Sequence, residues 1–246
     1  MNISFSYIND ADAATLTSSS ADPSFPAANV QQRWHVKPWR STGDAAEYLR
    51  FAMVGTPQLD IVIIKNHNLT AAATVQVNYY SDAYITLVHT DTMTVSAGLM
   101  AMLIDQDQPY FEITFADGAN PDGYIEIGRV WAGELFRPRI GFSMERAKVP
   151  QDPSVISESE NGQPASIQRT KFRTWDYTFE GVDPDDSDDM DDIFDEVGLS
   201  KALFICENPD EADITPYIKY IQFTSWEYEH IAGEWWKLMV EIKEER

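Results

Sequence analysis

The chain has 246 residues, of which 43% are apolar and 12% aromatic. This length accommodates one large β domain or two domains of about 100–150 residues each, with enough apolar residues for real cores. Lys and Arg total 18 against 40 Asp and Glu, a formal net charge of −22. Such a balance argues against direct binding to a nucleic-acid backbone, because phosphates are held by clusters of Lys and Arg.

Neither a secretory signal nor a membrane span is expected. The opening MNISFSYIND has no basic region followed by an apolar region, and no run approaches the ~18–20 apolar residues that cross a bilayer. The single cysteine, Cys206, excludes an internal disulfide. The histidines are dispersed and lack metal-ligand spacing: His35, His67, His89 and His230. We therefore predict no metal and no cofactor.

The stretch from Leu59 to Tyr80 organises the first half of the chain. Residues 59–64 form a continuous apolar run rich in β-branched side chains, which predicts a strand buried on both faces. The polar residues 65–68 predict a turn. Residues 74–79 then alternate between polar and apolar, which predicts a strand with one face exposed to solvent. A buried strand, a turn and a half-exposed strand are typical of an antiparallel sandwich or jelly roll.

Further strands are predicted on both sides of this stretch. Turn-forming clusters at 55–57, 105–109 and 117–123 separate apolar or alternating segments. These segments cover residues 48–52, 83–89, 99–104, 110–115 and 124–130. About eight strands with almost no helical periodicity fit a β-sandwich.

The order of several short segments resembles a galactose-binding-like, discoidin-type jelly roll. The segments that carry the resemblance are residues 39–41 (WRS), 48–51 (YLRF), 59–64 (LDIVII), 66–69 (NHNL), 74–77 (TVQV), 110–113 (YFEI) and 123–128 (GYIEIG). The form with the HNL segment and a closing GYIEIG strand is similar to domains of tail and baseplate proteins of tailed bacteriophages. We assign residues 1–137 to this jelly-roll domain.

The resemblance implies sugar binding by loops at one end of the jelly roll. Three aromatic residues could stack on a sugar ring, because aromatic faces suit apolar C–H patches: Trp34, Trp39 and Tyr84. Packing in the core or at a protein interface is the alternative for all three. His67 could serve as a ligand or base, but a turn histidine whose ring bonds to backbone groups is preferred.

The second half, residues 138–246, is predicted to be a separate β-rich domain. Residues 147–168 are polar and rich in turn formers, and such a length of weak structure indicates an extended arm. Residues 169–180 alternate with aromatic side chains and predict a strand. Further strands are predicted at 202–206, 217–228 and 235–242.

Residues 183–198 are strongly acidic, and we predict a surface helix here. A calcium loop is the alternative, but the segment lacks the glycine and the closing glutamate of an EF-hand at their required positions. Apolar residues fall at the helical spacing i, i+3, i+4 and i+7, with Asp183 as N-cap and Gly198 as terminator. The acidic side chains that would face solvent or a channel are Asp185, Asp188, Asp189 and Asp192.

The element order of the second half resembles the tail-tube-type β-barrel of phage tails, which also builds the ring domain of distal tail proteins. The resemblance implies a homo-oligomeric ring, hexameric in the family, in the virion after assembly in the host cytoplasm. Its partners would be the tail tube, the hub and the fibres, with DNA only passing through. Residues 139–246 carry 25 acidic and 11 basic side chains; an acidic lumen would explain this excess, and so would ordinary solubility.

The leading expectation from the sequence is therefore a structural component of a phage tail tip or baseplate. The alternative is a carbohydrate-binding receptor-recognition module of the tail, and a third reading is an accessory domain associated with an enzyme. The chain itself is not expected to be an enzyme, because no Ser/His/Asp order, nucleophile elbow or phosphate-binding glycine loop is present in it.

Overall fold

A computed structural model describes residues 2–33, 36–143, 148–158 and 164–245. The chain divides into two compact units. The sandwich unit comprises Ser6–Phe136 with Pro209–Ile218, and the arm unit comprises the residues up to Phe5 with 137–208 and 219–246. Within the part of the chain that is described, no helix has the length and apolar character that a membrane span requires.

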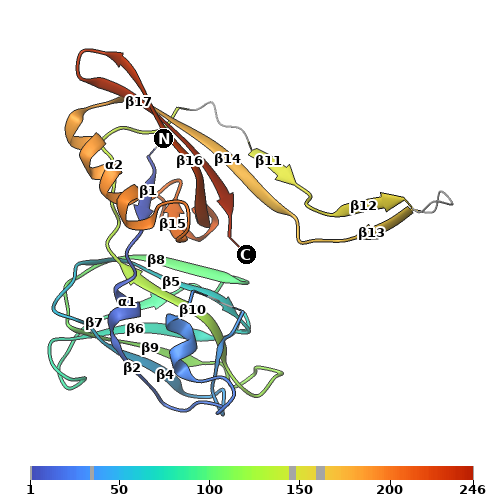
Figure 1. The fold of residues 1–246 in the computed structure, drawn as a ribbon. Helices are drawn as coiled ribbons and strands as arrows, with labels where there is room; N and C mark the ends of the chain where they lie inside the picture. The colour runs from blue at the N-terminus through green and yellow to red at the C-terminus, as the bar shows by residue number, and fades with distance from the viewer. Residues whose placement is uncertain (1, 34–35, 144–147, 159–163, 246) are drawn as a thin grey trace. The chain divides into compact units, whose positions relative to one another are not determined.

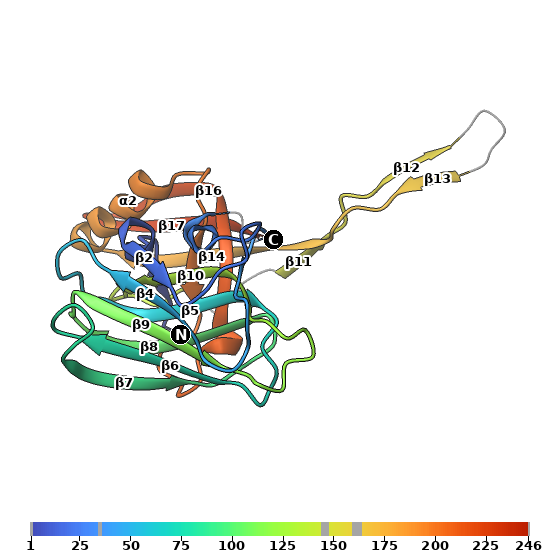
Figure 2. The same ribbon diagram turned by 90° about the horizontal axis from the view of Figure 1, so that it is seen from below.

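The sandwich unit contains two antiparallel sheets (Figures 1 and 2). A four-stranded sheet has the order β3-β10-β5-β8, and a five-stranded sheet has the order β2-β4-β9-β6-β7. Their strands are β2 (Thr15–Ser18), β3 (Trp39–Arg40), β4 (Glu47–Ala52), β5 (Leu59–His67), β6 (Thr74–Tyr80), β7 (Leu87–Met93), β8 (Leu99–Gln106), β9 (Tyr110–Ala116) and β10 (Glu126–Gly133). The unit's short helices are α1 (Asp10–Ala13), η1 (Ala27–Gln31) and η2 (Thr215–Tyr217). The predicted mainly β fold with an N-terminal sandwich is thus confirmed.

Strand β5 is buried on both faces, as predicted. Val62 and Ile64 belong to the core cluster that side chains of both sheets form, and Ile61 and Ile63 are also fully buried. The predicted turn at 65–68 is wrong, because β5 continues to His67, which pairs with β10. Strand β6 alternates buried and half-buried residues as expected.

The arm unit contains a six-stranded sheet with the order β1-β15-β16-β17-β14-β11 and one 14-residue helix, α2 (Pro184–Val197). The strands are β1 (Ser4–Ser6), β11 (Lys148–Gln151), β14 (Phe172–Val182), β15 (Leu203–Cys206), β16 (Ile218–Ala232) and β17 (Trp235–Glu244). Residues 1–5 were predicted to belong to the first domain, whereas β1 pairs in this sheet. Strands β1 and β11 lie at the two edges of the sheet, and the tail-tube-like barrel stays a prediction.

The acidic segment forms helix α2, as predicted from its apolar spacing. The Asp183 side chain accepts a hydrogen bond of 2.8 Å from the backbone N–H of Asp186 and caps the N-terminus. Met190 and Ile193 are buried, and the Phe194 ring stacks on Trp226 with centroids 5.3 Å apart. The burial of this stripe against the sheet explains why the segment is helical rather than a metal-binding loop.

A two-stranded ribbon occupies much of the predicted arm. Strands β12 (Val155–Glu158) and β13 (Pro164–Ile167) pair with each other antiparallel and form a sheet of their own. Figure 2 shows the ribbon continuing from β11 and β14. Residues 144–147 and 159–163 of this region lie outside the described residues.

Candidate functional site

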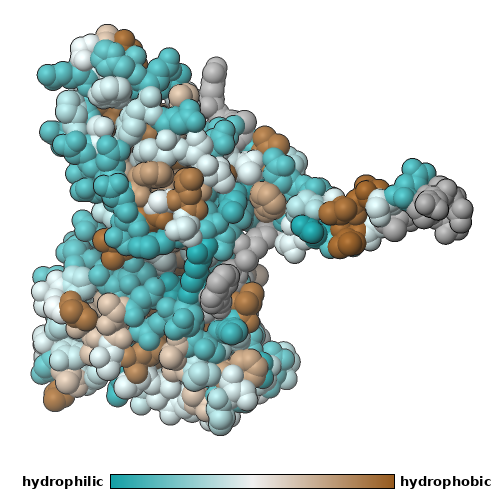
Figure 3. All heavy atoms as spheres, in the orientation of Figure 1, coloured by the Kyte–Doolittle hydropathy of each residue, from teal (hydrophilic) through white to brown (hydrophobic). Residues whose placement is uncertain are grey.

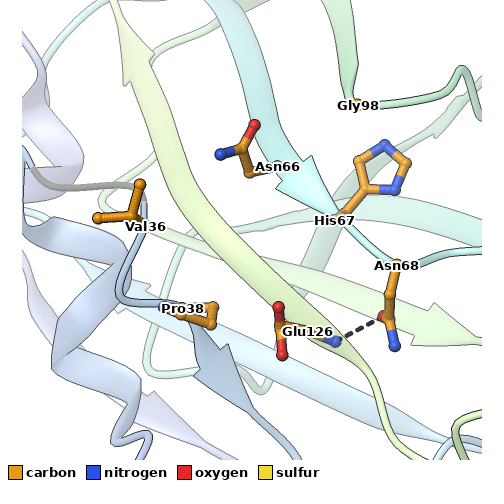
Figure 4. A pocket seen from close by; sticks show the side chains of 7 residues that line it. All are labelled: Val36, Pro38, Asn66, His67, Asn68, Gly98 and Glu126. Atoms are coloured by element: carbon orange, nitrogen blue, oxygen red, sulfur yellow. Dashed lines mark hydrogen bonds between the residues drawn. The ribbon is translucent and has the colours of Figure 1, made fainter. Parts of the chain in front are cut away.

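A pocket of about 460 Å³ opens at one end of the sandwich unit, where β5 ends and β10 begins. We call it the end pocket. It is lined by Val36, Pro38, Asn66, His67, Asn68, Gly98 and Glu126. In Figure 4, Val36 and Pro38 lie on one side of Asn66 and Glu126, and His67 and Gly98 lie on the other. Four separate parts of the chain thus contribute polar and apolar groups to one opening.

Asn68 fixes the wall of the end pocket. Its Nδ2 donates to the Asp122 carboxylate and to the Tyr124 carbonyl, both at 3.0 Å. Its Oδ1 accepts a 2.7 Å hydrogen bond from the Glu126 backbone N–H, the dashed line in Figure 4. Asn68 therefore ties the end of β5 to the loop before β10. Because its amide is used in these bonds, Asn68 acts as a positioning residue.

Asp117 holds the other end of the same loop. It is 2% exposed, and its carboxylate accepts hydrogen bonds from the Thr70 backbone N–H at 2.8 Å and the Thr70 hydroxyl at 2.6 Å. Asn120 Nδ2 also donates to Asp117, at 3.1 Å, and to the Asn68 carbonyl, at 3.2 Å. This hydrogen-bond network fixes the conformation of the loop at 117–124, which leads to Glu126 in the end pocket.

Arg40 and Glu126 form a polar edge on neighbouring strands. They are directly paired between β3 and β10, and the Arg40 guanidinium donates to Glu126 Oε2 at 2.7 and 3.2 Å. The guanidinium carbon lies 4.0 Å from the centre of the Phe25 ring and 4.3 Å from that of Tyr124. The two rings and the carboxylate fix the Arg40 side chain on three sides. Both Arg40 and Glu126 remain partly exposed.

Backbone groups hold the His67 ring in its neutral form, in agreement with the preferred interpretation from the sequence. The Leu69 backbone N–H donates to Nδ1 at 3.3 Å, so the proton is on Nε2, which lies 2.9 Å from the Ser96 carbonyl. Burial lowers the pKa of His67 from its ordinary value. The ring therefore stays uncharged at neutral pH and bridges β5 to the segment before β8.

The lowered pKa of His67 predicts a loss of stability in acid. The unfolded chain takes up a proton near the ordinary pKa of about 6.5, whereas the folded ring resists protonation. Stability from this group is therefore fully present above about pH 6.5 and decreases as the pH falls toward the folded pKa. We expect the melting temperature of His67→Gln to depend less on pH between 7.5 and 5 than that of the wild type. His230→Gln, at an exposed histidine, serves as the control; equal slopes for wild type and His67→Gln would contradict the assignment.

The residues singled out for sugar contact have different surroundings in the structure. Trp39 cannot contact a ligand: it is fully buried, its indole N–H donates to the Ser20 carbonyl at 2.9 Å, and its ring packs 6.0 Å from Phe115. Trp34 lies outside the described residues. Tyr84 is half-buried, in the loop between β6 and β7.

The acidic residues predicted on a surface or channel lie on α2. Asp185, Asp188, Asp189 and Asp192 are all exposed. Arg139 contacts Asp185 at 3.4 Å and Asp183 at 3.6 Å, so part of the acidic N-terminus of α2 is neutralised. Among the described residues, no three His, Cys, Asp or Glu side chains gather as a metal site would need.

Of the residues of the end pocket and its rim, only His67 could be considered as a possible contact from the sequence. The polar residues that were not predicted there are Arg40, Asn66, Asn68 and Glu126. Arg40 and Glu126 were present in the WRS and GYIEIG segments, but there they counted only as strand residues. Their cross-strand register brings them together from positions 86 residues apart. A sequence signal existed for Asn66, since asparagine tolerates the left-handed backbone that it adopts here, with φ of 55°.

No protein-family model and no curated protein matches the sequence. Solved structures similar to about half of this chain include carbohydrate-binding modules. A chitosan-binding module 1 from the chitosanase/glucanase of Paenibacillus sp. IK-5 has 15% identity and a TM-score of 0.43, covering 52% of this chain and 99% of the module. A fucose binding module of Streptococcus pneumoniae has 13% identity and a TM-score of 0.43, covering 52% and 95%. The family 32 carbohydrate-binding module of NanJ from Clostridium perfringens, in complex with galactose, has 12% identity and a TM-score of 0.42, covering 52% and 98%. At this level of similarity the fold assignment rests on the strand pairing described above.

Proposed function

We propose that the sandwich unit binds a saccharide in the end pocket. The observation that carries the proposal is the combination of partly exposed polar groups and apolar surface around one opening of about 460 Å³. Glu126 and Asn66 provide acceptors and donors for hydroxyl groups, whereas Val36 and Pro38 provide a surface for the C–H groups of a sugar ring. The volume falls in the range of small-ligand sites, about 300–1,000 Å³.

The Arg40–Glu126 pair defines the polarity of the site. Because the guanidinium and the carboxylate neutralise each other across a 2.7 Å contact, the rim can exchange hydrogen bonds with neutral hydroxyls without favouring a charged ligand. Charge-assisted hydrogen bonds are stronger than neutral ones, so a hydroxyl that bonds to Glu126 gains more than one that bonds to an amide. A neutral hexose or an N-acetylated hexosamine fits this description.

The direct test is binding to an immobilised glycan array, followed by calorimetric titration of the best monosaccharide or disaccharide. We expect Glu126→Gln to weaken binding at least ten-fold, since it removes the charged acceptor and its hold on Arg40. Glu227→Gln, at an exposed glutamate of the arm unit, is the matched control and should bind as the wild type does. Glycan binding that is the same in Glu126→Gln and wild type would refute the end pocket as the site.

A second candidate function is assembly into a tail-tip or baseplate ring, and the ribbon of β12 and β13 favours it. Val155 and Ile167 are directly paired across the ribbon, and they are 45% and 65% exposed, with Ile156 at 77%. Figure 3 shows apolar side chains gathered on this arm. An isolated two-stranded ribbon is marginally stable in water, so a partner that covers these side chains would stabilise it. In a ring, the exposed aspartates of α2 would be candidates for an acidic lumen.

Mass photometry tests the assembly function. If the chain assembles into a ring, we expect a cyclic oligomer for the wild type. The Ile156→Glu, Ile167→Glu double variant should dissociate. Val54→Glu, at a 74% exposed valine of the sandwich unit, should leave the oligomer intact. A wild-type chain that stays monomeric at micromolar concentrations, alone and with tail partners, would rule out the ring.

A further inference from the structure

The outer face of the five-stranded sheet carries a continuous row of polar side chains. Strand register places Thr17 opposite Arg50, Arg50 opposite Glu112, Glu112 opposite Asn78 and Asn78 opposite Thr90. The row crosses all five strands, about 19 Å at the usual strand spacing of about 4.8 Å. None of its residues lines the end pocket.

Hydrogen bonds connect the centre of this row. Arg50 Nε donates to Glu112 Oε2 at 2.5 Å, and Asn78 Nδ2 donates to Glu112 Oε1 at 3.2 Å. The Tyr80 hydroxyl also donates to Oε1, at 3.2 Å, and the Thr90 hydroxyl donates to Asn78 Oδ1 at 2.8 Å. Glu112 is only 5% exposed, while the groups around it are partly open to solvent. A buried carboxylate thus orients a set of donors and acceptors on an open sheet face.

Four tyrosines surround the row, and all are half-buried: Tyr48, Tyr80, Tyr84 and Tyr110. The Arg50 guanidinium carbon lies 4.3 Å from the centre of the Tyr48 ring and 4.8 Å from that of Tyr84. Tyr84 meets Tyr80 and Tyr110 edge to face, with centroids 5.7 and 5.3 Å apart. We call these tyrosines, with Arg50 and Glu112, the tyrosine face.

The loop between β6 and β7 is folded so that Tyr84 reaches this face. Tyr84 has a φ of 61°, a backbone conformation that is unusual for a bulky residue and that clusters at functional sites. Asp82 holds the loop, because its carboxylate accepts hydrogen bonds from the backbone N–H groups of Thr86 at 2.6 Å and Ile85 at 3.2 Å. The strained backbone therefore serves to place one aromatic ring over Arg50.

The tyrosine face is neutral within a strongly acidic chain. Arg50 and Glu112 cancel each other, and burial raises the pKa of Tyr84 to about 12, so its hydroxyl keeps its proton. The Arg50–Glu112 pair therefore offers no net charge to a polyanion or to a cationic peptide. Aromatic rings beside a linear row of neutral hydrogen-bonding groups suit a long, uncharged, polyhydroxylated ligand.

We propose that the tyrosine face is a second binding surface, which takes an extended neutral oligosaccharide lying across the strands. This inference rests on the proposed function for its ligand class, a saccharide, but the tyrosine face shares no residue with the end pocket. The end pocket holds one or two sugar rings, whereas the row is long enough to contact several. The tyrosine face would therefore make the affinity for an oligosaccharide increase with its number of sugar units.

Titration calorimetry with glucose, N-acetylglucosamine and their β-1,4-linked neutral hexamers tests this inference. We expect the wild type to bind a hexamer more tightly than its monomer. Tyr84→Ala should weaken hexamer binding at least ten-fold and leave monomer binding unchanged, while Tyr84→Phe, which keeps the ring, should bind as the wild type does. Circular dichroism confirms that each variant is folded, and Glu112→Gln provides an independent change at the centre of the row.

The outcomes separate this inference from the proposed function. Equal hexamer affinity in Tyr84→Ala and wild type overturns the tyrosine face but leaves the end pocket standing. Loss of hexamer binding in Tyr84→Ala, with no effect of Glu126→Gln on any sugar, supports the tyrosine face and overturns the end pocket. If Tyr84→Ala changes only the oligomeric state, the face binds protein and the inference is wrong.

Discussion

Replacing Trp39 by alanine is expected to destabilise the sandwich unit by about 3–5 kcal/mol, the range for large aromatic residues removed from a core. Trp39 is fully buried and packs against Phe115. The substitution leaves a cavity between the sheets and removes the donor to the Ser20 carbonyl. Both effects act in the same direction, since a partly buried carbonyl that loses its partner also costs stability.

Urea denaturation followed by circular dichroism measures this effect. Trp39→Phe should cost less, because it retains most of the ring volume and loses the hydrogen bond. Trp235→Ala is the matched control: Trp235 is 51% exposed, and exposed substitutions usually change stability by less than about 0.5 kcal/mol. A Trp39→Ala chain that unfolds at the wild-type urea concentration would show that Trp39 is not a core residue.

Replacing Asn68 by alanine is expected to cost about 2–3 kcal/mol of stability and to weaken saccharide binding at least ten-fold. The substitution removes three hydrogen bonds, to Asp122, to Tyr124 and from Glu126, each worth about 0.5–1.5 kcal/mol. The loop before β10 then loses its attachment to β5. Since Glu126 lines the end pocket, its displacement alters the rim that the ligand contacts.

Urea denaturation and calorimetric titration of Asn68→Ala test the two expectations separately. Gln108→Ala is the control, because Gln108 bonds only locally, to Asp107 in the loop between β8 and β9, among the hydrogen bonds described for it. Asn68→Ala with wild-type stability would contradict the role of the hydrogen-bond network. Reduced stability with unchanged affinity would show that the loop does not position the ligand-binding groups.

The strands of the sandwich unit could be predicted because their signals are local. The apolar run in β5 and the alternation in β6 depend on periodicity within single segments. Helix α2 was predictable for the same reason, since Met190 and Ile193 follow the helical repeat and Asp183 is a good N-cap. Local signals also explain the error at 65–68, where polar residues favour a turn but pairing with β10 extends the strand.

The site was largely beyond prediction because cross-strand register creates it. Arg40 and Glu126 become neighbours only when β3 pairs with β10, and nothing in either segment encodes that register. Trp39 lies in a strand of two residues, too short for a periodicity that would have indicated its burial. Tyr84 was predicted to lie in a strand over residues 83–89, whereas this strand begins only at Leu87. The left-handed backbone that directs Tyr84 over Arg50 depends on hydrogen bonds that the Asp82 carboxylate accepts.

The central claim is that the end pocket is a saccharide site, and a crystal structure of the chain with its tightest array-selected sugar tests it most directly. We expect the sugar between Val36 and Glu126, with a hydroxyl within hydrogen-bond distance of the Glu126 carboxylate or the Asn66 amide and with Asn68 unmoved. A sugar bound only to the arm unit, with the end pocket filled by solvent, would contradict the account.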